Sequence, residues 1–302
     1  MKANVTALDS TLAPDFKKVH SGRAGKIVRL IIVYVVMTVF AAVFLIPYIF
    51  MFLRAFSGAE QVAQLPVRMW PKPWTGEAFI ALFREGNYFK YTLQTLKIVG
   101  FNIIAIPLSS SFVAYGFSKT KFFGKKVIFT VMMSTMMLPG AVLQVPLYVL
   151  FARYLHWTDT ILPLTIPNLF GGGAIYIFLV RQYMVSIPRE LEEAARLDGA
   201  NPFLRYFLIT LPLCVPVLIF VMITVFNSCW SDFYGPLVYI GKEGAETLAY
   251  AVFKDAIYKY VSPIYVNLKM AGGLFMSIFP TILFVIFQKQ LIEGVSTSAL
   301  KG

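Results

Sequence analysis

Long apolar runs separated by short polar stretches dominate the chain. A helix needs about 20 residues to cross a hydrocarbon core about 30 Å thick. Six runs meet or approach this length: Leu30 to Leu53, Ile98 to Ser118, Val127 to Ala152, Ile161 to Val180, Leu211 to Trp230 and Met270 to Phe287. The pattern predicts an all-α membrane protein with six transmembrane helices. The fourth run is the weakest helix, because it contains Pro163, Pro167 and the glycines 171–173.

Composition supports this class. The 302 residues are 58% hydrophobic and only 14% charged, whereas about a quarter of the residues in soluble domains are charged. A net charge of +12 would suggest a nucleic-acid surface in a soluble protein. Here the lysines and arginines gather in short loops beside apolar runs, as cytoplasmic loops do. We expect a lipid bilayer around the chain and no nucleic acid.

The basic loops also predict orientation. Five lysines and arginines lie within residues 17–29, and four lysines lie within residues 119–126. Both segments are expected in the cytoplasm, which places both termini and residues 190–210 inside and the loops 54–97 and 231–269 outside. A cleaved signal peptide is the alternative for the first run. That run is too long for a typical signal, so we expect an uncleaved anchor.

Four parts follow: a cytoplasmic N-terminal arm (1–29), the first transmembrane helix with an external loop of amphipathic helices (30–97), a transmembrane core (98–290) and a cytoplasmic tail (291–302). In the external loop Thr75 is expected to cap a helix through Leu82. A second amphipathic stretch from Tyr88 leads into the next run. The tail is either a disordered end or is held by a partner.

A polar insert, residues 187–212, interrupts the core. Ser186 and Pro188 are expected to start a short helix over Arg189 to Leu197. Gly199 supplies the left-handed stop, and Asn201-Pro202 starts a second helix. A push on the first helix would then move the fifth run, because Pro212 lies near the first turn of that run.

Within the insert, Glu192 and Arg196 are spaced to pair on the exposed side of the first helix. Ala194 and Ala195 leave a low surface that another protein could approach. An apolar face on the second helix is expected to pack on the bundle: Leu204, Phe207, Leu208 and Leu211.

The insert resembles the EAA loop of binding-protein-dependent ABC importer permeases. The resemblance rests on Glu193-Ala194-Ala195, then Gly199 and Ile209-x-Leu211-Pro212. The run 187–200 resembles the carbohydrate-uptake, maltose-type branch, as do segments 138–148 and 230–237. Two places depart from that branch: Gln94-Thr95 stands where Asn-Ser is frequent, and Ser231 where Asn is usual.

The resemblance implies a transport subunit, not an enzyme, in the bacterial cytoplasmic (inner) membrane. Its ATPase-coupling residues would be Glu193, Ala194, Ala195, Asp198, Gly199, Ile209, Leu211 and Pro212. The chain has no Gly-x-x-x-x-Gly-Lys-Ser/Thr loop, so we expect ATP and Mg on a partner ATPase and no cofactor on this chain. The implied partners are an ABC ATPase dimer, a second and different permease, an extracytoplasmic solute-binding protein, and a sugar or oligosaccharide.

Four uncharged amides are candidates for a substrate pathway: Asn102, Gln144, Asn168 and Asn227. Amides in hydrocarbon usually face a bundle interior or a cavity. Interhelical hydrogen bonding is the favoured explanation and a polar ring for a hydroxyl-rich solute the second. Glycines 171–173 either break the fourth helix or allow close packing. The two histidines have no ligand-like neighbours, so we expect no metal site.

Three other classes fit less well. A channel would need charged or carbonyl rings, and an enzyme would need clustered catalytic groups. A secondary transporter is the serious alternative, but it often shows inverted repeats and intramembrane carboxylates, which are not evident.

Overall fold

The computed structural model describes residues 23–259 and 261–299, with side chains for 25–259 and 261–290. All regular elements in these ranges are helical, and one isolated β-bridge joins Ser57 to Trp74. The chain divides into two compact units, residues 1–50 and 51–302. Most of the expected N-terminal arm, residues 1–22, lies outside the described part.

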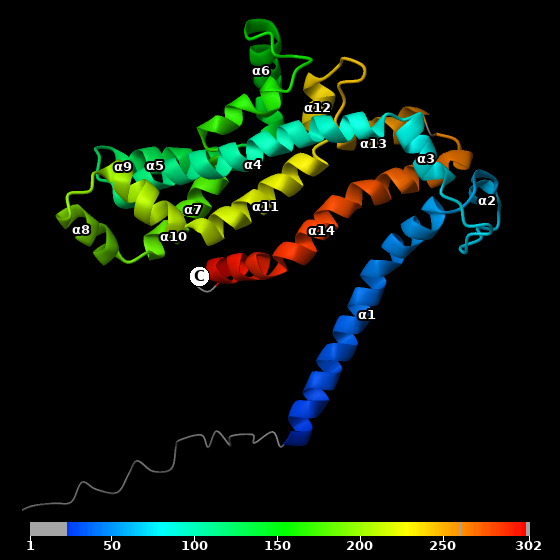
Figure 1. The fold of residues 1–302 in the computed structure, drawn as a ribbon, viewed down its shortest axis with the longest axis horizontal. Helices are drawn as coiled ribbons and strands as arrows, with labels where there is room; N and C mark the ends of the chain where they lie inside the picture. The colour runs from blue at the N-terminus through cyan, green and yellow to red at the C-terminus, as the bar shows by residue number, and fades with distance from the viewer. Residues whose placement is uncertain (1–22, 260, 300–302) are drawn as a thin grey trace, which may run out of the picture. The chain divides into compact units, whose positions relative to one another are not determined.

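Four helical stretches are long and apolar enough to cross a membrane, or six if each of two bent pairs is one span. The unbroken helices are α1 (Arg23–Ala55), α4 (Tyr88–Lys119) and α14 (Val266–Ala299) (Figure 1). The backbone of residues 291–299 continues α14, so most of the expected tail is helical. The all-α class is confirmed, but only three of the six runs form unbroken helices.

The third run is bent. It consists of α5 (Lys125–Ser134), the 3₁₀ turn η1 (Thr135–Met137), α6 (Gly140–Val149) and the π turn η2 (Leu150–Tyr154), with a 98° bend between its halves. Leu138 and Pro139 are extended, with ψ of 122° and 128°. A residue before proline is driven out of the helical region by contact with the proline ring. The single helix expected over Val127 to Ala152 is therefore wrong.

The fourth run is broken by its glycines. Two 3₁₀ turns, η3 (Leu162–Leu164) and η4 (Ile166–Phe170), precede α7 (Ala174–Ser186). Glycines 171–173 have φ values of 97°, 64° and 121°, which residues other than glycine rarely adopt. A Cβ on Gly172 would lie 2.6 Å from Cγ2 of Ile106 on α4. The glycines thus break the helix and also allow close packing.

The fifth run is also bent. Residues 202–213 and α11 (Val215–Ser231) meet at 73°, next to Cys214. The first part consists of α9 (Pro202–Arg205), the π turn η5 (Tyr206–Thr210) and α10 (Leu211–Leu213). Pro212 falls at the start of α10, as expected.

The two long loops contain short helices: α2 (Ala59–Ala63), α3 (Glu77–Arg84), α12 (Tyr234–Tyr239), α13 (Leu248–Lys254), η6 (Asp255–Lys259) and η7 (Pro263–Tyr265). The helix expected after Thr75 is confirmed as α3. Gly76 holds the cap position, but Thr75 Oγ1 still accepts the Glu77 N–H at 3.2 Å. The amphipathic stretch from Tyr88 is the first part of α4.

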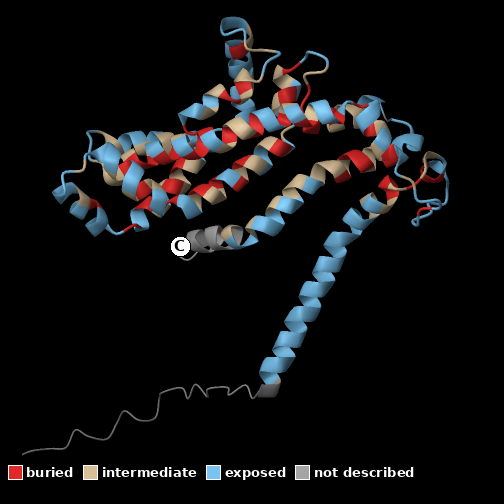
Figure 2. Ribbon diagram, viewed as in Figure 1, coloured by how far each residue is buried: buried red, intermediate tan, exposed pale blue. Residues whose placement is uncertain are grey.

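The core of the second unit follows α4 and α11, which run side by side (Figures 1 and 2). One apolar cluster joins them to α7 around Val180, Met184 and Val221. A second cluster joins them to α3, α13 and α14. There the buried Trp230 donates its indole N–H to Met276 O at 2.8 Å. These two clusters make α4 a continuous support for both ends of the unit.

The Gly172 contact gives a testable prediction. Gly172→Ala should lower the free energy of unfolding by about 1–3 kcal/mol, because it adds an overlap at Ile106 and strains a left-handed residue. Gly100→Ala on α4 is the control, since its Cβ meets nothing within 4 Å; it should leave stability unchanged or raise it by up to about 1 kcal/mol. Thermal unfolding in detergent measures both, and equal melting temperatures would contradict the packing argument.

Candidate functional site

The insert forms a helical elbow at one end of the second unit. After α7, Ile187 and Pro188 are extended, and α8 (Arg189–Leu197) follows. Ile187 is buried, and its carbonyl accepts a hydrogen bond from Lys119 Nζ at the end of α4 at 3.1 Å. The expected cap at Ser186 is wrong, because its hydroxyl donates backward to Tyr183 O at 2.7 Å. Pro188 holds the cap position without a side-chain bond.

The turn after α8 is a glycine stop. Gly199 has φ +82°. Its N–H donates to Arg196 O at 3.1 Å, and the Ala200 N–H donates to Ala195 O at 2.9 Å. This is the Schellman pattern, which satisfies the last carbonyls of a helix. Asn201 then caps α9 by accepting the Leu204 N–H at 2.9 Å. The expected helix stop at Gly199 and the expected start of a second helix at Asn201-Pro202 are both confirmed.

Glu192 holds α8 to the rest of the unit. Its side chain is buried, and it accepts hydrogen bonds from Thr210 Oγ1 on η5 at 2.5 Å and from Tyr115 Oη on α4 at 3.4 Å. Arg205 on α9 adds an ion pair at 3.6 Å. The exposed Glu192–Arg196 pair expected from the i,i+4 spacing is therefore wrong. One carboxylate instead joins α8 to three other elements.

The second helix also packs differently from expectation. Leu204, Phe207 and Leu208 are exposed in this chain, and the buried residues are Tyr206 and Thr210. Tyr206 shares a 2.7 Å hydrogen bond with Ser111 on α4. The π turn changes the helical period here, so a 3.6-residue pattern selected the wrong face. Of the remaining predicted coupling residues, Ile209 and Leu211 are half-buried and Pro212 is exposed.

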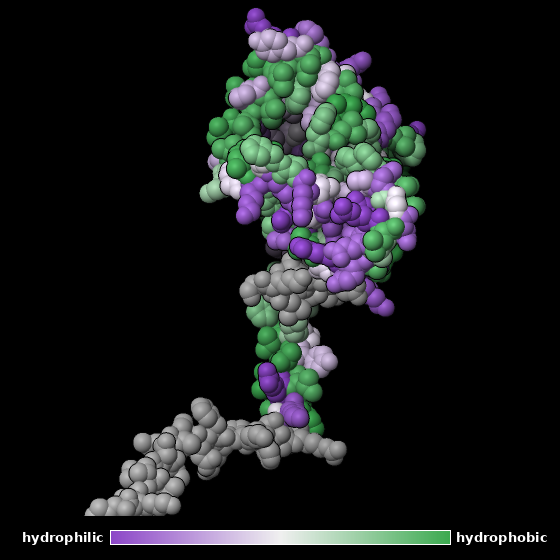
Figure 3. Space-filling model, turned by 90° about the vertical axis from the view of Figure 1, so that its left-hand side faces the viewer, coloured by the Kyte–Doolittle hydropathy of each residue, from purple (hydrophilic) through white to green (hydrophobic). Residues whose placement is uncertain are grey.

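The outer side of α8 is open. Glu193, Ala194, Asp198 and Gly199 are exposed, and Ala195 is half-buried. Leu197 is 89% exposed, and the sequence argument did not single it out. Figure 3 looks onto this end of the unit and shows hydrophilic side chains gathered beside apolar surface. A helix that is held on one side and has a small, mixed, exposed face on the other is suited to docking.

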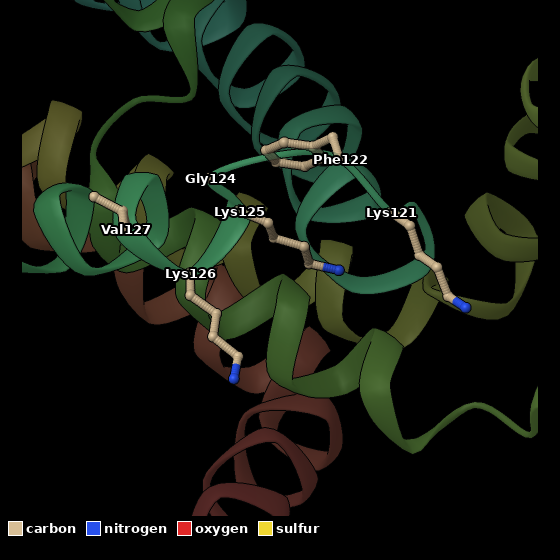
Figure 4. Close-up of a pocket in the computed structure, with 6 residues that line it drawn as sticks. All are labelled: Lys121, Phe122, Gly124, Lys125, Lys126 and Val127. Atoms are coloured by element: carbon tan, nitrogen blue, oxygen red, sulfur yellow. The ribbon is translucent and has the colours of Figure 1, made fainter.

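A shallow hollow lies beside the elbow, in the loop between α4 and α5. Lys121, Lys125 and Lys126 line it, together with Phe122 and Gly124. Figure 4 shows that the three ammonium groups point in different directions. Lys125 donates to Thr120 O at 2.8 Å. The arrangement fits a positively charged loop better than a site that converges on one ligand.

The loop 231–269 contains an ion pair between a buried carboxylate and a partly exposed lysine. Lys254 Nζ lies 2.8 Å from Oε1 of the buried Glu246. Burial alone would raise the pKa of Glu246, but hydrogen bonds from Lys254 and the backbone outweigh it and lower that pKa. The same hydrogen bond raises the pKa of Lys254. Burial raises the pKa of Asp255, which accepts a 3.3 Å hydrogen bond from Tyr88. The Tyr88–Asp255 bond joins the start of α4 to η6, and the Glu246–Lys254 pair holds the end of α13 to the loop before it.

Two of the four candidate pathway amides meet. Asn168 Nδ2 donates to Asn102 Oδ1 at 3.1 Å, and Asn102 Nδ2 donates to Leu164 O at 3.0 Å. Gln144 instead accepts from Tyr234 Oη. The exposed Asn227 bonds Ile223 O in its own helix at 3.0 Å. The bond between Asn102 and Asn168 is the interhelical hydrogen bonding that the sequence analysis favoured. Gln144 and Asn227 have separate partners.

The chain matches a known protein family over residues 106–297, the binding-protein-dependent transport system inner membrane component. It is 30% identical over 258 residues to a putative ABC transporter permease, ORF2, of Caldicellulosiruptor sp. (strain Rt8B.4), covering 85% of this chain and 92% of that protein. It is 31% identical over 215 residues to the maltose/maltodextrin transport system permease protein MalG of Escherichia coli (strain K12), covering 69% and 71%.

The fold also matches a solved structure, that of a bacterial ABC transporter involved in the import of the acidic polysaccharide alginate. The TM-score is 0.76 at 22% identity, covering 89% of this chain and 98% of that chain. The family match includes the whole elbow, residues 187–212. The chain belongs to the family of inner-membrane components of binding-protein-dependent transport systems.

Proposed function

We propose that this chain is the permease subunit of an ATP-driven importer that carries a sugar or oligosaccharide into the cytoplasm. The observation that carries the proposal is α8, which is held by buried polar bonds on one side and open on the other. The relatives include a maltose/maltodextrin permease and a chain of an alginate importer. The substrates of both proteins are carbohydrates, which supports a carbohydrate cargo.

A partner ATPase dimer would bind ATP and Mg and dock on the exposed face of α8 through Glu193, Ala194 and Leu197. A second, different permease would complete the pathway, and an external solute-binding protein would deliver the sugar. The chain would lie in a bacterial inner membrane with both termini and the elbow in the cytoplasm. The loop lysines beside the elbow support this orientation.

Movement of α8 would reach the membrane helices through Glu192. Its partners Tyr115 and Thr210 lie on α4 and just before α11. Those two helices pack together along the unit, so a displacement of α8 by the closing ATPases would be passed to both. Alternating access then follows from tilting this pair against the second permease.

Docking on α8 predicts a charge effect at Glu193. Glu193→Lys should lower receptor-stimulated ATP hydrolysis in the reconstituted complex at least tenfold or release the ATPase, while stability changes little because the side chain is exposed. Glu77→Lys on the exposed surface of α3 is the matched control and should behave as wild type. Wild-type stimulation in both variants, at equal membrane abundance, would refute docking at α8.

The buried carboxylate predicts a separate effect. Glu192→Ala leaves Thr210, Tyr115 and Arg205 without their shared acceptor, so α8 should lose about 1–3 kcal/mol of attachment. ATP hydrolysed per sugar imported should rise, and amide exchange in α8 should accelerate. Glu192→Asp, which retains the charge, should recover part of the coupling.

Glu190→Ala is the control for this experiment, because Glu190 lies exposed on the same helix. If the two variants Glu192→Ala and Glu190→Ala show the same amide exchange in α8 and the same ATP hydrolysed per sugar imported, the Glu192 carboxylate has no role in attaching α8.

A further inference from the structure

The turn between α4 and α5 is too short to leave the membrane surface. α4 ends at Lys119 and α5 begins at Lys125. Each belongs to a stretch that is long and apolar enough to cross a membrane, α5 as part of a bent pair. A chain that leaves one span and returns to the next over residues 120–124 rises at most about 10 Å, little more than the headgroup layer of a bilayer. The turn is therefore expected among lipid headgroups.

The exposed side chains of this turn are basic and aromatic. Lys121 and Lys126 are exposed, and Phe123 at the tip is 101% exposed. Three lysines line the hollow of about 380 Å³ described above, and their ammonium groups point in different directions (Figure 4). Ammonium groups spread in this way suit several separate anionic groups on a surface better than one ion in a pocket.

Other cations lie close to the turn. The guanidinium groups of Arg181 on α7 and Arg189 on α8 are near enough for their charges to act on the Lys125 ammonium. Arg181 is held there by Phe129, whose ring centroid lies 4.3 Å from Cζ. Both ion pairs of the described residues involve other side chains. Like charges at short range repel one another, and an anion from outside the chain would relieve that repulsion.

An apolar surface continues from the turn along α5. Val127, Ile128 and Val131 are 67%, 50% and 61% exposed. A phospholipid would satisfy both parts of this surface, because its phosphate would meet the lysines and its acyl chains would meet Phe123 and the face of α5. Basic clusters next to a membrane span attract anionic lipids in this way. A soluble anion would satisfy the lysines alone.

We propose that the turn 119–126 binds anionic phospholipids of the cytoplasmic leaflet, with Lys121 and Lys126 at the headgroup phosphates and Phe123 inserted between the lipids. The inference goes beyond the function proposed above and does not depend on the transported solute.

The test uses the assembled importer in vesicles of about three parts phosphatidylcholine to one part phosphatidylglycerol, an anionic surface of the kind that attracts basic segments. Bromine is placed on the acyl chains of one lipid or the other. Phe123→Trp puts a fluorescent reporter at the tip of the turn, and the emission of the importer without this change is subtracted.

Brominated phosphatidylglycerol should quench the reporter at least about twofold more per molecule than brominated phosphatidylcholine, because each lysine near an anionic surface strengthens the attraction about fivefold. At about 1 M salt this ratio should fall toward one, since the Debye length is then about 3 Å.

Lysine variants in the Phe123→Trp background test the residues. Lys121→Gln/Lys126→Gln should bring the quenching ratio to about one, and Lys121→Arg/Lys126→Arg, which retains the charges, should keep it. Lys72→Gln/Lys242→Gln is the matched control. It removes the same charge from two exposed positions in the loops that are expected outside, so its ratio should equal that of Phe123→Trp alone.

Four results overturn the proposal. A ratio of one in the Phe123→Trp importer refutes the preference for anionic lipid, and an equal loss in the control and in Lys121→Gln/Lys126→Gln shows an effect of overall charge. Quenching by acrylamide but by neither brominated lipid places the turn in water, or, where removal of the ATPase is needed to expose the reporter, under a protein partner. Loss of the preference when inorganic phosphate replaces chloride at constant ionic strength assigns the lysines to a soluble anion.

Discussion

The buried carboxylate of Glu192 is the interaction on which the elbow, residues 187–212, depends. A carboxylate removed from water needs charged or hydrogen-bonding partners, and Glu192 finds them on α4, α9 and η5. The rest of α8 is mostly exposed, so its position follows from that set of bonds and from the buried Ile187 beside it. These bonds attach α8 to α4 and to the residues that precede α11.

Breaks in the apolar runs shape the rest of the second unit. A broken helix at membrane depth is tolerated where the freed backbone groups are buried in protein or line a cavity. Here Ser109 on α4 satisfies a backbone donor at the break after η4, because its Oγ accepts a hydrogen bond from the Gly171 N–H at 3.1 Å. Leu164 O, freed from a regular helix, accepts from both Asn102 and Asn168. A cavity of about 400 Å³ lies at the break and is bordered by these same amides.

α4 connects the elbow with the cavity at the break in the fourth run. Toward its end it supplies Ser111 and Tyr115 to the elbow, in its middle it supplies Asn102 to the cavity, and near its start it supplies Thr95 to the first turn of α13. α11 accompanies it, and Trp230 anchors that helix to α14. The elbow and the cavity therefore share the same two helices.

Sequence alone determined the membrane class, the six apolar runs, the helix stop at Gly199, the cap at Asn201 and the family resemblance of the elbow. These follow from composition, local backbone preferences and spacing, which a single sequence expresses directly. It did not determine the bend at Pro139, the inward turn of Glu192 or the burial of Tyr206 in place of Leu204 and Phe207.

The bend follows from a local contact at Pro139 that the hydropathy pattern does not express. Only the tertiary structure decided the other two features, because they depend on partners far away in sequence. Glu192 turns inward because Tyr115 and Thr210 are there to donate, and no pattern within residues 189–197 contains that information. The cavity has the same origin, since two of its lining residues, Asn102 and Thr247, stand more than a hundred residues apart. Periodicity places residues on faces, but which face is buried is settled by the elements that pack against it.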